Sequence, residues 1–232
     1  MKIRLNKFLS SEGITSRRKA DELISSGRVD VNKKVVTELG FRVDPDFDIV
    51  VVDGEQVKVQ KRVYYLLHKP KGFVTTTDDE KGRKTVMHLI ENSKGLFPVG
   101  RLDINTTGAL IITNDGDFAN TVLHPSFGKK RVYVAKLTRS ISEENQKRLS
   151  RGIVIDGRRS KFIEFTSLSK DNDYVRVSTL EGRNHFVKKM FEAIGIFVKD
   201  LHRESFAGLT LNDMPVGAYR VITETELSKM LG

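Results

Sequence analysis

An arginine and an aspartate two residues apart stand in a short polar stretch between two apolar segments of the chain. Gly100-Arg101-Leu102-Asp103 precedes a polar run, and Gly108 opens the uncharged segment Ala109–Ile112. An apolar run without alternation is typical of a strand covered on both faces, and a glycine at each end lets the backbone turn sharply. A carboxylate held in this way, with a cation two residues away, suits a preorganised reactive group. An ordinary surface Arg–Asp pair in a turn has the same spacing.

Two further side chains fit the same kind of site. Tyr133 follows the basic cluster Lys129–Arg131, an order typical of an aromatic ring that stacks on a base beside bound phosphates. A core tyrosine with a polar tip fits this order equally well. Lys188 lies about 100° around a predicted helix from the apolar residue Val187. It can therefore reach a carboxylate near the start of the helix, or it can lie in solvent.

Several other chemistries lack the residues they need. Gly95 and Gly100 have the spacing of a phosphate-binding P-loop, but Arg-Leu follows where Lys-Ser/Thr is required. Neither a G-x-G-x-x-G loop nor a G-x-S-x-G elbow is present. The five histidines have no paired spacing for zinc. We therefore expect no metal and no cofactor.

The overall charge of the chain points to a polyanionic partner. Among 232 residues, 40 are Lys or Arg and 30 are Asp or Glu, which gives a formal net charge of +10. This excess favours nucleic acid, although a merely solvated basic surface also fits. The absence of cysteine excludes disulfides, thiolate zinc sites and cysteine nucleophiles. Because the sequence has neither a membrane-length apolar run nor a signal peptide, we expect no membrane partner. The absence of cysteine also fits the reducing cytoplasm, where we expect the protein to be located. We expect a monomer.

Residues 1–60 form the first expected domain, with two short helices followed by short strands. Apolar residues over Ile3–Leu9 predict one helix, and Ser16 is placed to cap a second helix over Arg17–Ser25. One basic face on a helix pair fits contact with an RNA backbone, which is recognised largely by shape. A DNA-binding helix-turn-helix is the rival, but the second helix lacks side chains spaced to read base edges. The candidate RNA contacts in this domain are Arg4, Lys7, Arg17, Arg18 and Lys19.

Residues 61–232 form the second, larger expected domain. A predicted strand over Val63–Leu67 is broken by the basic turn His68–Gly72 and resumes over Phe73–Thr77. A short helix is predicted over Val86–Glu91. The candidate RNA contacts in this domain are Lys69, Lys71, Arg83, Lys84, Lys129, Lys130 and Arg183.

Longer strings around these residues resemble one family. G-R-L-D-x-x-T-x-G-A-L-I-I-T-N-D-G, at residues 100–116, closely resembles the signature of the RsuA/RluB-like ribosomal RNA pseudouridine synthases. K-R-V-Y-V-A-K at residues 130–136 and E-G-x-x-x-x-V-K-K-M-F at residues 181–191 match its second and third motifs, and K-P-x-G at residues 69–72 matches a further element. L-N-K-F-L-x-x-x-G-I-T-S-R-R-K-A-D-E-L-I, at residues 5–24, resembles the α-L RNA-binding module. The resemblance spans essentially the whole chain.

The resemblance implies a fold and a reaction. The fold is α+β, with a small α-L module and a larger domain built on a mixed, mainly antiparallel sheet flanked by helices. The reaction is the isomerisation of a uridine in ribosomal RNA to pseudouridine on a flipped-out nucleotide. The family assigns catalysis to Asp103, as nucleophile or base, contact with the base to Tyr133, and pairing with the aspartate to Lys188. Arg101 would hold the RNA backbone or fill the gap left by the base.

The chain departs from the family at Phe186, where glutamine is usual. D-x-K-G-R-K-T-V, H-P-S and M-F-E-A-I-G look closer to the large-subunit branch, whereas His185 and the short length look more like the small-subunit branch. We expect large-subunit ribosomal RNA as the substrate. The competing function is a non-catalytic RNA-binding factor of ribosome assembly, which explains the charge but not the three matching motifs.

Overall fold

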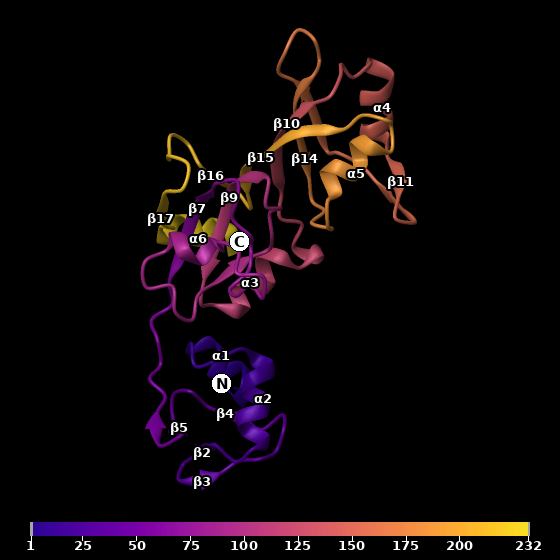
Figure 1. Ribbon diagram of the computed structural model, residues 1–232. Helices are drawn as coiled ribbons and strands as arrows, with labels where there is room; N and C mark the ends of the chain where they lie inside the picture. Colours follow the sequence, from indigo (N-terminus) through magenta and orange to yellow (C-terminus); the bar gives the residue numbers. More distant parts are fainter. Residues whose placement is uncertain (1, 232) are drawn as a thin grey trace. The chain divides into compact units, whose positions relative to one another are not determined.

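The computed structural model describes residues 2–231, and the chain divides into two compact units (Figure 1). One unit comprises the chain up to Val63 together with the later segments Asn92–Phe97 and Thr113–Gly116. The other comprises Tyr64–Glu91, Pro98–Ile112 and the chain from Asp117 onward. No helix in the described part of the chain has the length and apolar character needed to cross a membrane.

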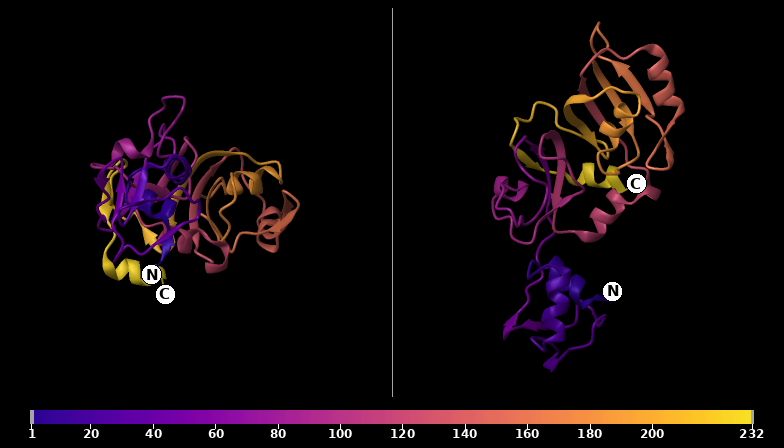
Figure 2. Two further views of the ribbon diagram at one scale, coloured as in Figure 1. Left: turned by 90° about the horizontal axis from the view of Figure 1, so that it is seen from below. Right: turned by 45° about the vertical axis from the view of Figure 1, so that its right-hand side comes forward.

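The first unit packs two helices against short strands. α1 (Leu5–Ser11) and α2 (Arg17–Ser25) lie side by side (Figures 1 and 2). The predicted cap of α2 is present, since the Ser16 side chain accepts a hydrogen bond from the backbone N of Lys19 over 3.3 Å. α1 begins later than predicted because Ile3 belongs to a strand that pairs with β4. The strands are β1 (Ile3–Arg4), β2 (Val29–Val31), β3 (Lys34–Val35), β4 (Arg42–Val43), β5 (Val50–Val52) and β6 (Glu55–Gln56), with sheet order β3-β2-β5-β6 and β1 against β4.

Asn114 holds the end of this unit in place. Its side-chain Oδ1 accepts a hydrogen bond from the backbone N of Val63 over 3.0 Å, and its Nδ2 donates to the carbonyl of Lys61 over 3.0 Å. Asn114 is 1% exposed. Asn114, in the T-N-D segment of the sequence motif, therefore fixes the backbone of Lys61 and Val63 and has a structural role.

The second unit is built on a nine-stranded sheet of order β13-β14-β10-β15-β9-β7-β17, with β16 paired to β15 and β8 paired to β9. β15 pairs antiparallel with β10 and parallel with β9, so the sheet is mixed and mainly antiparallel, as expected. The strands of this sheet are β7 (Tyr64–Lys69), β8 (Phe97–Val99), β9 (Thr106–Thr113), β10 (Arg131–Leu137), β13 (Glu164–Ser167), β14 (Tyr174–Thr179), β15 (Val198–Phe206), β16 (Leu209–Thr210) and β17 (Tyr219–Val221).

Helices and one hairpin flank this sheet. In Figure 1, α4, α5 and β11 gather beside β14. β11 and β12 form a separate two-stranded hairpin. These elements are α3 (Gly116–Leu123), α4 (Glu143–Arg151), α5 (Phe186–Glu192), α6 (Glu224–Leu231), β11 (Ile153–Ile155) and β12 (Arg158–Ser160), with short 3₁₀ turns over Val86–Leu89 and Pro125–Phe127.

The central strand β9 is buried as its sequence predicts. Ala109 to Ile112 are each 0% exposed, which confirms a strand covered on both faces. The prediction of a strand over Phe73–Thr77 is wrong, because only Val74 forms an isolated bridge, to Thr85. The prediction that the strand before the basic turn ends at Leu67 is also wrong, since β7 continues through Lys69.

The last helix begins with a reciprocal pair of side-chain caps. The backbone N of Glu226 donates to the Thr223 side chain over 3.2 Å, and the backbone N of Thr223 donates to the Glu226 carboxylate over 2.9 Å. Arg220, on β17, donates two hydrogen bonds to the same carboxylate, over 2.7 and 2.8 Å. These contacts tie the start of α6 to the edge strand of the sheet.

Candidate active site

Asp103 lies in the loop that joins β8 to β9. The Thr75 hydroxyl donates a hydrogen bond to the carbonyl of Leu102 over 2.7 Å, and the backbone N of Gly72 donates to the carbonyl of Ile104 over 2.8 Å. Within the loop, the backbone N of Thr106 donates to the carbonyl of Asp103 over 3.0 Å. The aspartate is therefore held by its own loop and by the neighbouring chain.

Lys69 supports this loop from inside the protein. It is 0% exposed, and its Nζ donates hydrogen bonds to the carbonyls of Asp103, Thr106 and Pro70 over 2.9–3.0 Å. Burial lowers the pKa of Lys69 to about 8. The prediction that Lys69 contacts RNA is corrected here, because all three ammonium hydrogens are donated to carbonyls within the protein.

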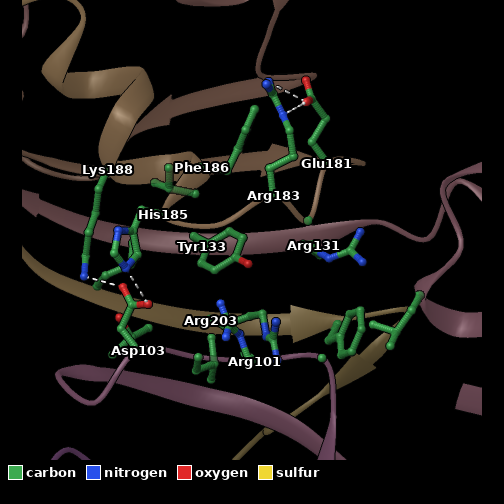
Figure 3. Close-up of a pocket in the computed structure, with 18 residues that line it drawn as sticks. Arg101, Asp103, Arg131, Tyr133, Glu181, Arg183, His185, Phe186, Lys188 and Arg203 are labelled. Carbon is green, nitrogen blue, oxygen red and sulfur yellow. Dashed lines mark hydrogen bonds and ion pairs between the residues drawn. The ribbon is translucent and has the colours of Figure 1, made fainter. Parts of the chain in front are cut away.

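Two basic side chains converge on the Asp103 carboxylate (Figure 3). The Lys188 Nζ lies 2.5 Å from Oδ2, and the His185 Nε2 lies 3.2 Å from Oδ1. Lys188 is in the first turn of α5, and His185 is the residue just before it, with φ of 55°. This left-handed backbone turns His185 toward the aspartate instead of continuing the helix. The Asp103 side chain remains 28% exposed, so a ligand can reach it.

Tyr133 lines the same pocket from β10. It is 9% exposed, and in Figure 3 its ring lies between the α5 segment above and Arg203 below. The register of β10 against β15 shifts between Val132 and Tyr133. A bulge of this kind re-aims a side chain, here at the pocket.

The pocket continues toward two buried arginines. Arg131 and Arg203 are 5% and 2% exposed, and both guanidinium groups lie over the Phe206 ring, 5.1 and 4.4 Å from its centroid. Backbone carbonyls accept from them, since Arg203 Nε donates to Ala109 over 2.7 Å and Arg131 Nη1 donates to Leu180 over 2.9 Å. Burial and the neighbouring Arg203 lower the pKa of Arg131. Within residues 2–231 neither arginine has an ion pair with a carboxylate, so the pocket is cationic at this end.

A glycine permits the close approach of two strands behind the site. Gly108, in β9, has φ of 123°, and a Cβ atom there would collide with the backbone N and carbonyl of Arg203 in β15. Only glycine avoids both the strain and the collision. The glycine predicted to end the loop therefore lies within the sheet, as the third residue of β9, where it pairs with Arg203.

Arg101 is exposed and stands at the mouth of the pocket. Its Nη2 donates to the Asn184 side chain over 3.1 Å. It lines both the pocket and an adjoining open groove, which Asp103 and His185 also line. The pocket itself has a volume of about 80 Å³, smaller than the roughly 300–1,000 Å³ of typical small-molecule sites, and it shares Arg101, Asp103 and His185 with the open groove beside it.

The remaining predicted RNA contacts differ in their exposure and in whether they form ion pairs within the protein. Several are exposed, among them Arg17, Arg18 and Lys19 in the first turn of α2. Others are exposed or half-buried in ion pairs: Lys71 with Asp200, Arg83 with Asp79, and Lys130 with Glu164. Arg4 and Lys84 are exposed, and Lys7 and Lys129 are half-buried.

Arg183 is held by the protein itself. Its three nitrogen atoms donate hydrogen bonds to the Glu181 carboxylate, the carbonyl of Ile155 and the Ser160 hydroxyl, and its guanidinium lies 5.5 Å from the centroid of the Phe186 ring. It ties the β11–β12 hairpin to the segment before α5. Arg183 also lines the pocket and is half-buried, so its contact with RNA stays a prediction.

Phe186, the departure from the family pattern, packs inward. It is 4% exposed and meets Phe162 edge-on, with ring centroids 6.1 Å apart.

Sequence reasoning did not place His185 or Arg203 in the site. The left-handed conformation that aims His185 has no local sequence signal, and Arg203 reaches the pocket only through the pairing of β15 with β9 and β10. Within the described residues, no group of three His, Cys, Asp or Glu side chains could hold a metal ion.

Comparison with known proteins adds independent findings. A family model described as RNA pseudouridylate synthase matches residues 63–193, and a model of the S4 domain matches residues 3–50. The ribosomal large subunit pseudouridine synthase B of Bacillus subtilis is 40% identical over 232 residues, which cover 98% of this chain and 95% of the relative. An RNA pseudouridine synthase of Aquifex aeolicus is 40% identical over 234 residues, covering 99% of this chain and 94% of the relative.

A solved structure shares the fold of the whole chain. The crystal structure of a pseudouridylate synthase is 27% identical, covers 98% of this chain with 99% of its own, and superposes with a TM-score of 0.70. The family resemblance of the sequence motifs and the α+β fold are thereby confirmed. The α-L module expected at the start of the chain corresponds to the S4 domain.

Proposed function

The chain belongs to the RNA pseudouridine synthase family, and from this premise we propose that it isomerises a uridine of ribosomal RNA, in the large subunit, with Asp103 as the reacting carboxylate. It is an isomerase with an RNA-binding S4 domain. One observation carries the assignment of Asp103. Its carboxylate stands in the pocket, 28% exposed, on a loop whose backbone carbonyls accept hydrogen bonds from the buried Lys69.

The reaction needs a carboxylate at the ribose. The bond between uracil N1 and the anomeric carbon breaks, the base turns, and ring carbon C5 joins the same carbon while its proton is lost and N1 gains one. Asp103 begins this sequence in one of two ways. It attacks the anomeric carbon and is displaced when C5 joins that carbon, or it removes a proton from the neighbouring ribose carbon and returns it after C5 has joined. Both routes use the same carboxylate position, which Lys188 and His185 hold by direct contact. Fixed, charged groups aimed at the reacting centre need no reorganisation during the reaction.

The other pocket residues receive the base. A stacked uracil cannot turn in place, so the nucleotide must leave the helix at a cost of about a few kcal/mol. The Tyr133 ring in the pocket offers the base a stacking surface. Arg101, exposed at the mouth, is suited to hold a phosphate or to occupy the space left by the base. The S4 domain and the net charge of +10 supply binding energy from parts of the RNA that do not react.

The large-subunit assignment rests on the overall likeness to the Bacillus subtilis synthase, whose name states that substrate. The experiment is to incubate the protein with unmodified transcripts of both subunit RNAs and to map pseudouridine by carbodiimide-stop primer extension. A new stop in the large-subunit RNA alone is expected. A stop only in the small-subunit RNA would overturn the subunit assignment, and no stop in either would favour the assembly-factor function.

Replacement of Asp103 by Asn tests the mechanism. Because Asn has nearly the same shape but cannot attack or remove a proton, the D103N variant should bind RNA normally and lose turnover by roughly 10³-fold or more. Single-turnover assays and RNA titrations measure the two effects separately. A matched control is D115N, which changes an aspartate outside the pocket. Turnover close to that of the unsubstituted protein in D103N would remove the proposed mechanism.

A further inference from the structure

A basic groove lies on the catalytic unit outside the pocket. We use this name for the depression lined by Arg148 and Arg151 of α4, by Arg159 and Lys161 in and after β12, and by the apolar residues Val154, Ile163 and Leu180. Two adjoining hollows share Arg151, Gly152 and Arg159 and so form one continuous surface. None of these cations belongs to the site described above.

The groove carries positive charge that nothing nearby neutralises. All four cations are exposed, and within residues 2–231 none of them forms an ion pair with a carboxylate. The one carboxylate that lines the groove, Glu181, is already paired with Arg183 over 2.8 Å. Arg148 and Arg151 lie in the last turn of α4, where their positive charges interact favourably with the negative end of the helix dipole. This interaction accounts for their position. Arg159 and Lys161 come from another element, so the helix does not explain them.

The groove also exposes apolar surface between its cations. Val154 is 68% exposed, Ile163 is 46% exposed and Leu180 is 45% exposed. Cationic side chains interleaved with flat apolar surface suit a ribose-phosphate backbone, which offers both anionic oxygen atoms and sugar faces. An acidic protein segment would need the same charge, and the experiment below separates the two partners.

The groove leads directly to the pocket that holds Asp103. Glu181 lines both, and the carbonyl of the adjacent Leu180 accepts a hydrogen bond from Arg131 in the pocket wall over 2.9 Å. Arg183 also connects the groove with the pocket. It lines the pocket, as Lys188 does, and it donates a hydrogen bond to the hydroxyl of Ser160 in β12, which lines the groove. The pocket and the groove therefore adjoin each other at Glu181.

We propose that the basic groove binds the phosphate backbone of the RNA strand next to the flipped uridine, as a second RNA-binding surface on the catalytic unit besides the S4 domain. This inference rests on the proposed function, because it takes RNA as the substrate that occupies the pocket. Arg151, Arg159 and Lys161 provide the phosphate contacts. The groove thus fixes the position of the strand beside the reacting nucleotide.

The test compares two triple variants of the full-length protein. The first changes Arg151, Arg159 and Lys161 to Gln. The control changes Lys170, Lys199 and Lys229 to Gln, three exposed lysines that line neither the pocket nor the groove and remove the same charge. The groove variant should bind the unmodified ribosomal RNA transcript about tenfold or more weakly, and the slope of log K against log salt should fall by roughly 2–3. The control variant should keep both the RNA affinity and the single-turnover rate of the unsubstituted protein.

A second measurement locates the RNA. Because the chain has no cysteine, a single cysteine placed at exposed Val154 can carry an iron chelate that cleaves nearby RNA by hydroxyl radicals. Cleavage is expected within a few nucleotides of the modified uridine. The same chelate at Lys170→Cys should give no cleavage at those nucleotides.

The outcomes separate the two proposals. If the unsubstituted protein modifies no ribosomal RNA, the proposed function fails. If it modifies the RNA but the groove and control variants bind equally and Val154→Cys gives no cleavage near the uridine, the groove inference alone is overturned. Unchanged RNA binding with loss of binding to an acidic polypeptide such as polyglutamate would assign the groove to a protein partner instead.

Discussion

At the scale of single residues, the candidate site depends on groups that are not themselves reactive. The carboxylate of Asp103 is oriented by Lys188 and His185 from one side, while Lys69 holds its backbone from the other. The motifs named Asp103 and Lys188 from their types and spacing. They did not place His185 in the site, because the left-handed backbone that this residue adopts just before α5 has no signal in the local sequence. They also gave Lys69 the wrong role, because burial of a lysine depends on the surrounding sheet rather than on its neighbours in sequence.

Replacement of Lys69 by Met tests the support of the loop. Met keeps the aliphatic length but leaves three buried carbonyls without their donor, and an unsatisfied buried group costs about 1–3 kcal/mol. Some of this cost is offset because a buried ammonium no longer has to be desolvated. We expect the K69M variant to lose stability by a few kcal/mol in urea denaturation and to turn over slowly even where it is folded. Control K170M, at an exposed lysine that lines neither the pocket nor the basic groove, should retain both stability and turnover. Equal stability of the two variants would contradict the role of Lys69.

At the scale of elements, the sequence predicted those segments whose periodicity agrees with their final burial. The cap and both ends of α2 and the fully buried β9 follow from local pattern alone. The segment Phe73–Thr77 has strand-forming residues but no strand beside it, since Val74 alone finds a partner. A strand is completed by its neighbour in the sheet, so composition cannot decide such a case.

The start of α6 gives an element-scale prediction about pH. Hydrogen bonds from Arg220 lower the pKa of Glu226 from 4.5 to about 2. Because the pKa of the folded state is depressed, the stabilisation is fully present above about pH 4.5 and is lost as pH falls from 4.5 toward 2. The E226Q variant should therefore lose less than about 1 kcal/mol at neutral pH, given the partial exposure of the pair. Its stability should also fall less steeply over that acid range.

The measurement for this pair is thermal or urea denaturation at a series of pH values. R220Q is the matched control, because it removes the same pair from the other side. The double variant should lose little more than either single variant. A pH dependence of E226Q identical to that of the unsubstituted protein would show that the Glu226 carboxylate does not contribute.

At the scale of the whole molecule, the charge serves contacts that are separate from the chemistry. The first turn of α2 exposes Arg17, Arg18 and Lys19, all within the S4 domain. Changing all three to Gln should weaken binding of the ribosomal RNA transcript and lower its salt slope by roughly one unit for each lost phosphate contact. The rate at saturating RNA should stay unchanged, since none of these residues lines the pocket. An unchanged salt slope would mean that another face of the S4 domain meets the RNA.

Every side chain assigned to the pocket, from Asp103 on its loop to Lys188, Tyr133 and Arg203, is contributed by the second unit alone. The S4 domain and the groups assigned to the reaction are therefore encoded in separate stretches of sequence, whereas the basic groove shares its stretch with the pocket. Exchange of the S4 domain, in evolution or in the laboratory, would therefore change which RNA the enzyme binds. The pocket residues that rearrange the nucleoside would stay the same.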